Sequence, residues 1–315
     1  MLDSKKDFIL VYGDAFVDYI ADDSQNKNFT KFLGGATVNV AAGIARLGGN
    51  SSFITITGED NTSEFVRDEL INEGVDLFYS QYLAEKRVSG VYVHLTPEND
   101  RIFHTYIDET PNLQVDYQLI DGTAFKRAAA FHFCSGTLFH PTARMTTRNI
   151  VEEIKQNGGL LSFDVNVRPL RWESEELCRE TILSFMQKVD ILKMTDEELF
   201  FLTETSSREA GLAALQPYNI PIILLTVGSE GTYAILHGEM FHIPVEKVTA
   251  VDTTGAGDAF MAGILTRIQQ EGAPQSKSQW VEYISFGNSM GARCATKLGA
   301  LSAMPKLAEI TLAKV

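Results

Sequence analysis

The segment AVDTTGAGDAF, residues 250–260, combines three small residues with a carboxylate. Gly255, Ala256 and Gly257 precede a helical pattern, so bare backbone and the free N–H groups of a helix start would suit a phosphoryl group. Asp258 would repel the ligand of a simple anion-binding loop. A phosphotransferase, by contrast, needs a base beside the phosphoryl group to take the proton of the attacking hydroxyl. We therefore predict that Asp258 points toward an alcohol acceptor, although the short motif alone also fits a glycine-rich turn with an acid that favours the helix dipole.

Familiar nucleotide motifs are absent from the chain. It has no G-x-x-x-x-G-K-[ST] loop and no protein-kinase H-R-D or D-F-G set. Phosphoryl transfer would have to use another scaffold.

The elements around the segment alternate between buried strands and amphipathic helices, which indicates a mostly parallel sheet covered on both faces. Apolar runs predict strands at 8–14, 51–58, 128–136, 159–166, 189–195 and 221–228. Helical periodicity predicts helices at 37–48, 61–74, 142–158, 174–188, 256–272 and 278–299. A further strand at 245–251 would lead into the glycine turn, at the sheet edge where ligands bind in open parallel sheets.

Two segments interrupt this rhythm. Residues 16–35 and 89–108 contain no helix signal, and the second alternates around the turn PEND as a hairpin does. We interpret both as a small β lid on one edge of the α/β core, with two independent surface hairpins as the alternative. No repeat or linker divides the chain, so we predict a single domain over residues 1–315.

Composition narrows the class of protein. A net charge of −14 argues against nucleic acid and anionic membrane surfaces as partners. The three cysteines are far apart and odd in number, which favours a reducing compartment. No signal peptide or membrane-spanning run is evident, so we expect a cytoplasmic protein.

Two motifs together carry a family resemblance that spans nearly the whole chain. GGATVNVAAGIARLGG (34–49) and DTTGAGDAF (252–260) resemble the N- and C-terminal signatures of the ribokinase-like (PfkB) sugar kinases. The resemblance implies an α/β core with a β lid, the use of ATP and Mg²⁺, phosphorylation of a hydroxymethyl group, K⁺ as an additional ion, and a homodimer formed through the lid.

The resemblance also implies roles for individual residues. It makes Asp258 the catalytic base and Gly255, Ala256 and Gly257 the anion hole. Sugar-binding residues would be Asp18, Gly34, Gly35, Asn39, Asp164, Asn166 and Arg168. Nucleotide-binding residues would be Thr226, Gly228, Gly231 and Asn288. Glu198 would hold the divalent metal through water, and Asp252 and Thr254 a monovalent cation.

Several of these residues also have a structural interpretation. Asp18 could be a solvated lid residue, Glu198 a surface helix acid, and Asn288 a hydrogen-bonded helix residue. Gly34 and Gly35 could form only a turn.

The substrate is suggested by FDVNVRPLRW (163–172), which resembles a stretch of bacterial fructokinases and 2-keto-3-deoxygluconate kinases. Arg168 could pair with a phosphate or with a sugar carboxylate. Fructose is the first hypothesis and a sugar acid the second. A nucleoside kinase and a non-catalytic sugar-binding regulator are alternatives, and the intact Asp258 turn argues against the latter.

Overall fold

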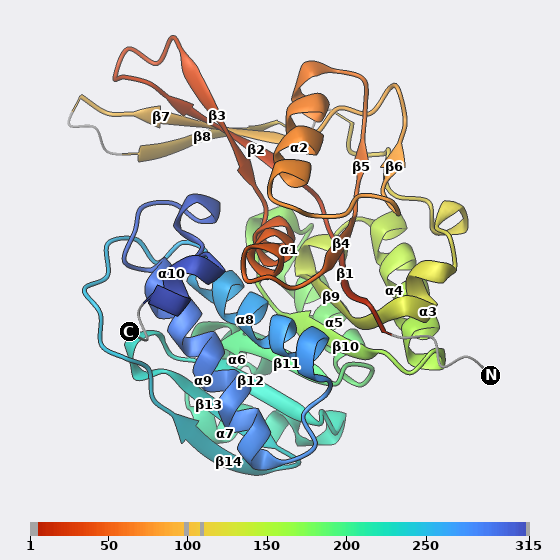
Figure 1. The fold of residues 1–315 in the computed structure, drawn as a ribbon, viewed down its shortest axis with the longest axis vertical. Helices are drawn as coiled ribbons and strands as arrows, with labels where there is room; N and C mark the ends of the chain where they lie inside the picture. The colour runs from red at the N-terminus through yellow and green to blue at the C-terminus, as the bar shows by residue number, and fades with distance from the viewer. Residues whose placement is uncertain (1–5, 98–100, 108–109, 313–315) are drawn as a thin grey trace.

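The computed structural model describes residues 6–97, 101–107 and 110–312. Its centre is an eight-stranded sheet in the order β14-β13-β12-β11-β10-β9-β1-β4 (Figure 1). All neighbours are parallel except β12–β13 and β13–β14. The strands are β1 (Phe8–Tyr12), β4 (Ser51–Ile54), β9 (Ala128–Cys134), β10 (Leu160–Asp164), β11 (Ile191–Thr195), β12 (Ile222–Thr226), β13 (Thr232–Leu236) and β14 (Glu239–Ile243).

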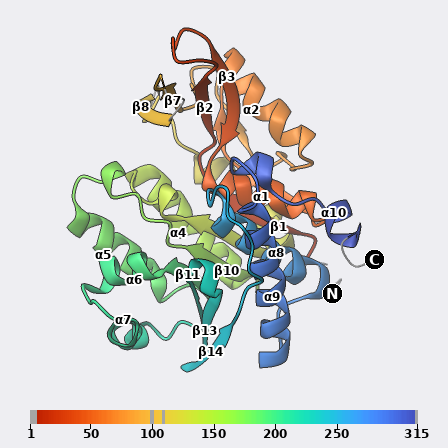
Figure 2. The same cartoon turned by 90° about the vertical axis from the view of Figure 1, so that its left-hand side faces the viewer.

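Helices cover both faces of this sheet (Figure 2). Alternate side chains of a strand point to opposite faces, so Ile9 and Val11 of β1 join one core cluster while Phe8 and Leu10 join the other. Helices α1, α8 and α9 pack into the first cluster, and α3 to α7 into the second. The helices are α1 (Ala36–Arg46), α2 (Asn61–Asn72), α3 (Thr123–Arg127), α4 (Pro141–Gln156), α5 (Glu175–Met186), α6 (Asp196–Thr203), α7 (Arg208–Leu215), α8 (Ala256–Glu271), α9 (Lys277–Cys294) and α10 (Leu307–Leu312).

A separate four-stranded sheet lies beyond one edge of the core (Figures 1 and 2). Its order is β3-β2-β7-β8, where β2 (Phe16–Ala21) pairs with β3 (Phe29–Gly34) and β7 (Gly90–Leu95) with β8 (Arg101–Ile107). The two interrupting segments therefore pair with each other through β2 and β7 instead of forming independent hairpins. The predicted PEND turn lies mostly outside the described residues. A short pair, β5 (Ile56–Thr57) and β6 (Gln81–Tyr82), lies nearby.

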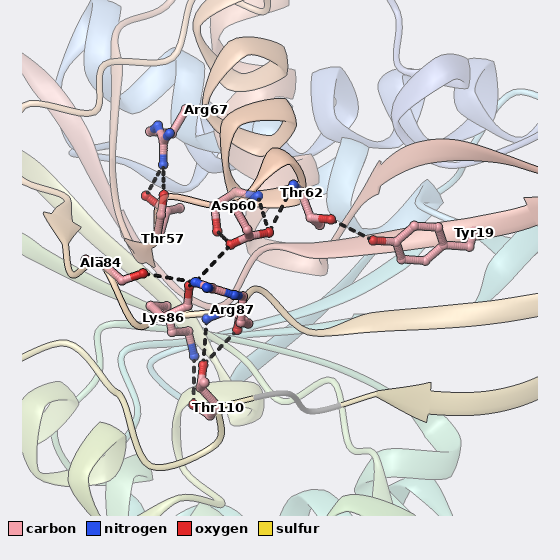
Figure 3. A network of polar contacts seen from close by, with 11 residues as sticks. Tyr19, Thr57, Asp60, Thr62, Arg67, Ala84, Lys86, Arg87 and Thr110 are labelled. Carbon is pink, nitrogen blue, oxygen red and sulfur yellow. Dashed lines mark hydrogen bonds and ion pairs between the residues drawn. The ribbon is translucent and has the colours of Figure 1, made fainter.

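Polar contacts tie the small sheet to α2 (Figure 3). The hydroxyl groups of Tyr19 on β2 and Thr62 on α2 lie 2.9 Å apart. Asp60 caps α2 through the backbone N–H groups of Thr62 and Ser63, and it faces Arg87 at 3.7 Å. The base of the small sheet is thus anchored by an ion pair and a capped helix.

The structure corrects two expectations near the C-terminal part of the sheet. The predicted strand at 245–251 is absent, and its side chains are largely exposed, with Val251 57% exposed. The backbone N–H groups of Val251 and Asp252 donate to the Ala295 carbonyl at the end of α9, so this segment has no strand partner. The antiparallel β13–β14 hairpin was not predicted, although the sequence alternates on both sides of His237-Gly238.

All helices that the structure describes lie within residues 6–97, 101–107 and 110–312. None of the helices there combines the length and apolar composition that a bilayer span requires.

Candidate active site

A cavity of about 990 Å³ lies between the small sheet and the core. Strands β2, β3 and β7 line one side, and the starts of α1 and α8 and the loops after β9 and β10 line the other. It brings together ten predicted site residues from distant parts of the chain, namely Asp18, Gly34, Gly35, Asn39, Asn166, Arg168, Asp252, Thr254, Gly255 and Asp258.

The two signature motifs meet at one hydrogen bond in this cavity. Asn39 Nδ2, on the second turn of α1, donates to Asp258 Oδ2, in the first turn of α8, over 2.8 Å. Asn39 is buried, and its Oδ1 has no hydrogen-bond partner among the described residues. The contact fixes the Asp258 carboxylate at the cavity wall and leaves a second acceptor beside it.

The environment of Asp258 makes it a weaker acid than an ordinary aspartate. Burial raises the pKa of Asp258 to about 6, and the neighbouring Asp164 carboxylate adds to the rise. The Asn39 hydrogen bond and the positive charges of Lys193 and Arg168 oppose it. A carboxylate with a pKa nearer to neutrality is a better proton acceptor than one near 4, so the site is tuned for general-base chemistry.

The glycine turn before Asp258 provides backbone donors. Gly255 caps α8 with φ +78°, a conformation that favours glycine, and no side chain caps the helix. The N–H groups of Gly257 and Asp258 have no acceptor among the described residues, as expected for the first turn of a helix. The Ala256 N–H, also predicted as an anion donor, instead donates to the Thr253 carbonyl over 3.1 Å.

The Gly34-Gly35 turn lies across the cavity and has a clear steric reason for each glycine. A Cβ on Gly34 would lie 2.7 Å from Oδ2 of Asp18, so any larger residue would displace that carboxylate. Gly35 adopts φ +120°, and a Cβ there would lie 2.9 Å from the Asp14 carbonyl oxygen. The two glycines therefore do more than form a turn: Gly34 leaves room for the Asp18 carboxylate, and Gly35 allows close approach of the Asp14 backbone.

The loop after β10 contributes polar groups of different kinds. Asn166 lines the cavity with φ +37°, and its carbonyl oxygen accepts a hydrogen bond from Ser135 Oγ. Arg168 also lines the cavity and is exposed. Asp164 is buried and does not line the cavity; both of its oxygens accept hydrogen bonds from Lys193 Nζ at 3.0 Å.

The predicted nucleotide residues lie outside the cavity. Thr226 ends β12, and Gly228 and Gly231 follow it with φ +47° and +102°. Asn288 is buried on α9, where it accepts from Thr232 Oγ1 and donates to the Ile243 carbonyl. Its observed contacts tie α9 to the β13–β14 hairpin.

Two predicted cation positions have oxygen-rich surroundings. Glu198 forms a capping box with Thr195, and its two carboxylate oxygens accept from the backbone N–H groups of Val167 and Thr195. Asp252 accepts from the N–H and hydroxyl of Thr254 and from the Gly299 N–H. Within the described residues, no group of three or more His, Cys, Asp or Glu side chains could hold a metal by itself. The donors fit a metal that is bound through water or through a substrate.

Two positively charged side chains near the cavity, those of Lys193 and Arg171, were not predicted from the sequence. Lys193 lies within the apolar run predicted as a strand, and a lone lysine there was the available signal. The Arg171 guanidinium packs over the rings of Phe16 and Phe139, at 5.4 Å and 4.6 Å, and lines the cavity. Its partner rings come from distant segments, so no local pattern indicated it.

Comparisons with known proteins agree with this geometry. The sequence matches the pfkB family carbohydrate kinases over residues 6–307. The fructokinase of Klebsiella pneumoniae is 36% identical over 298 residues, which cover 94% of this chain and 96% of that protein.

Comparison with solved structures also identifies kinases, fructokinases among them. A double mutant of Vibrio cholerae O395 fructokinase, bound to fructose, ADP and potassium ion, aligns with a TM-score of 0.87 and 30% identity over 98% of both chains. The aminoimidazole riboside kinase of Salmonella enterica, bound to aminoimidazole riboside and an ATP analog, aligns with a TM-score of 0.86 and 27% identity over 97% of this chain and 99% of that one. The chain belongs to the pfkB family of carbohydrate kinases and is an ATP-dependent sugar kinase.

Proposed function

We propose that this chain is a fructokinase that converts D-fructose and ATP to fructose 6-phosphate and ADP. The observation that carries the proposal is the Asn39–Asp258 hydrogen bond at the wall of the cavity between the small sheet and the core. The similarity to fructokinases over nearly the full chain supports the choice of sugar.

In the proposed reaction, Asp258 accepts the proton of the sugar 6-hydroxyl as that oxygen attacks the γ-phosphorus. The new P–O bond forms while the bond to the β–γ bridging oxygen breaks, and ADP leaves. The backbone N–H groups at Gly255–Gly257 and the start of α8 stabilise the negative charge on the transferred group. We retain Ala256 in this set, although its N–H has an internal acceptor.

Sugar recognition is assigned to polar groups on both sides of the cavity. Asp18 and Asn39 accept hydrogen bonds from sugar hydroxyl groups, and the Gly34-Gly35 backbone lies close to the sugar ring. Asn166 and Arg168 contact the far side, whereas Asp164, which was also predicted to bind the sugar, is buried against Lys193 and has no direct contact in this proposal. Thr226, Gly228, Gly231 and Asn288 are assigned to the nucleotide side.

Metal ions complete the proposal. Glu198 would hold water molecules of Mg²⁺, and Asp252 and Thr254 would lie beside K⁺. When bound, Mg²⁺ neutralises phosphate charge during transfer.

The small sheet is proposed to act as a lid within a single catalytic domain, residues 1–315, with lid segments at about 16–35 and 89–108. We also propose that two lids pair in a homodimer and that the enzyme works in the cytoplasm. Saturating sugar should protect lid amides from hydrogen exchange, and unchanged exchange in both segments would contradict lid closure.

A phosphorylation screen with ketoses, aldoses, sugar acids and nucleosides tests the substrate. We expect fructose to give the highest kcat/KM. A preference for a sugar acid such as 2-keto-3-deoxygluconate would instead assign the exposed Arg168 guanidinium to a carboxylate. A preference for ribosides would favour the activity named for the Salmonella relative.

A further inference from the structure

Lys193 is a buried cation on an otherwise mostly apolar strand, β11. Its Nζ lies 3.0 Å from each carboxylate oxygen of Asp164, and the two side chains are 7% and 3% exposed. Removing both charges from water is costly, and a well-packed apolar pair is often as stable as a buried ion pair. Stability alone therefore does not account for a lysine at this position.

The ammonium lies directly against the glycine turn of α8. A Cβ on Gly257 would lie 3.0 Å from Lys193 Nζ and 3.5 Å from its Cε. Gly257 does not have the positive φ of Gly255, so a side chain at this position would press on the lysine ammonium and would not strain the backbone. Lys193 thus packs beneath the backbone that faces the transferred phosphoryl group.

Lys193 stays protonated in these surroundings. Burial lowers its pKa, but Asp164 on β10, Glu198 on α6 and Asp258 on α8 outweigh burial and hold the pKa of Lys193 above its ordinary value. Arg168 is the other cation that acts on Asp258.

The remaining titratable groups nearby are neutral at physiological pH. Burial and the charge of Lys193 lower the pKa of His132 to about 3, and its Nδ1 lies 2.9 Å from Ser162 Oγ. Burial raises the pKa of the Cys134 and Cys294 thiols to about 12. Lys193 is therefore a fixed positive charge among three carboxyl groups.

We propose that Lys193 is a positioning residue for phosphoryl transfer: clamped by Asp164, its ammonium holds positive charge beneath the Gly257 turn, where the transferred group gains negative charge. The inference rests on the proposed kinase function. A charge that is already oriented in a poorly hydrated interior needs no rearrangement during the reaction, so it lowers the barrier more than a mobile surface lysine would.

The first test is Lys193→Met, which keeps the length of the side chain and removes its charge. We expect kcat to fall about 10- to 10²-fold, less than or equal to the loss of a direct oxyanion donor, while the KM values change much less. The pKa that governs the acid limb of kcat/KM should rise, because Lys193 is one of the charges that hold the pKa of Asp258 down.

A double variant, Lys193→Met with Asp164→Asn, distinguishes a catalytic role of Lys193 from simple neutralisation of Asp164. It leaves neither partner as an unpaired buried charge, so it also guards against misfolding of the single variant. It removes one positive and one negative charge, so a lysine that only neutralised Asp164 would be dispensable in it. We expect kcat to stay low while the acid-limb pKa returns toward the wild-type value, since Asp164 and Lys193 act on Asp258 in opposite directions. Recovery of wild-type kcat would overturn the proposal.

Met194→Ala is the matched control, because it creates a cavity at a buried position of the same strand. It should lower the melting temperature without moving the acid-limb pKa. A pKa shift equal to that of Lys193→Met would indicate general distortion of β11 and contradict a specific role for the charge.

Binding of ADP, fructose and aluminium fluoride by calorimetry provides a readout that does not depend on turnover. Lys193→Met should weaken the binding of this transition-state mimic more than it weakens the binding of ATP. An equal loss of affinity for the two ligands would overturn the inference. A wild-type protein that phosphorylates no sugar and binds no ATP would instead overturn the proposed function. Normal wild-type turnover with unaltered kcat in Lys193→Met would overturn the inference alone.

Discussion

Two kinds of helix start coexist in this molecule. Helices α1 and α8 begin at Gly35 and Gly255, without a side chain that caps their N–H groups. Six other helices begin with a capping side chain, from Asp60, His140, Ser174, Thr195, Ser207 and Ser276. A capping side chain accepts from one or two of the free N–H groups, whereas a glycine start leaves these groups and the space beside them to a ligand. Both of these glycine starts lie at the cavity, whereas Gly122, where the five-residue α3 begins without a side-chain cap, does not line it.

The two glycine starts at the cavity, those of α1 and α8, also differ from each other. The first turn of α1 contains no acid, while that of α8 contains Asp258. In the proposed reaction, the α1 start contacts the neutral sugar, and the α8 start contacts the arriving phosphate and takes up the departing proton. The comparison indicates that an acid is present only at the helix start where the proposed reaction needs a base, and the following variants test it.

The largest effect is expected for Asp258→Asn. Asparagine keeps a similar size and can still accept the Asn39 hydrogen bond, but it cannot take a proton at neutral pH. We expect kcat to fall at least about 10²-fold, with little change in ATP affinity. Steady-state kinetics and ATP binding measure both quantities.

The same variant has an internal control in its stability. Because the folded state raises the pKa of Asp258, the charged carboxylate costs stability above about pH 6, and asparagine removes that cost. The melting temperature at pH 7 should not decrease. An unfolded variant would assign Asp258 a structural role, and a near-normal kcat would place the base elsewhere.

A smaller effect is expected for Gly34→Ala at the other glycine turn. The new Cβ would displace the Asp18 carboxylate, which is 2.7 Å from its position. Loss of a hydrogen bond from a charged group weakens binding by about 1.5–3 kcal/mol, so the sugar KM should rise about 10- to 10²-fold with kcat less affected. An unchanged sugar KM would exclude Asp18 from sugar recognition.

The pH dependence of kcat/KM tests the glycine turn of α8 without a mutation, because only that turn carries an acid. With the pKa of Asp258 at about 6, protonation below that pH removes the base, so kcat/KM should fall about tenfold per pH unit on the acid side. A rate profile that stays flat down to pH 5 would contradict this assignment.

The smallest effect on activity is expected for Ser276→Ala at a side-chain-capped start. Ser276 Oγ accepts from the Gln279 N–H at the start of α9, and its loss should cost about 0.5–2 kcal/mol of unfolding free energy with kcat unchanged. Chemical denaturation measures the first quantity. A large loss of activity here would break the distinction between the two kinds of helix start.

Much of the architecture was predictable because it depends on local patterns. Continuous apolar runs and helical periodicity indicated the core strands and the main helices, since each pattern reports the burial of a single element. The segment 245–251 resembled a strand in composition, but strand formation also needs a neighbour, and this segment has none.

The site residues likewise fall into those that a local pattern indicates and those that only the fold brings together. Glycine turns with an acid are recognisable locally, so both motifs and Asp258 could be named in advance. The partner of Asp164 could not, because Lys193 lies on another strand and only the sheet register brings them together. Asn288 shows the converse: its position suggested a nucleotide contact, while its observed hydrogen bonds are to Thr232 and Ile243.

The bond between Asn39 and Asp258 joins residues separated by 219 positions in the chain. During synthesis, the sugar-facing half of the centre leaves the ribosome long before α8 exists. A nascent or truncated chain that ends before α8 lacks Asp258, the proposed base, and also the helix against which α1 packs. Contacts this distant in sequence also form late, because loop closure must precede them. With Asp258 as the proposed base, an incomplete copy of the enzyme cannot transfer phosphate to a sugar, and activity appears only when the last part of the chain has folded onto the first.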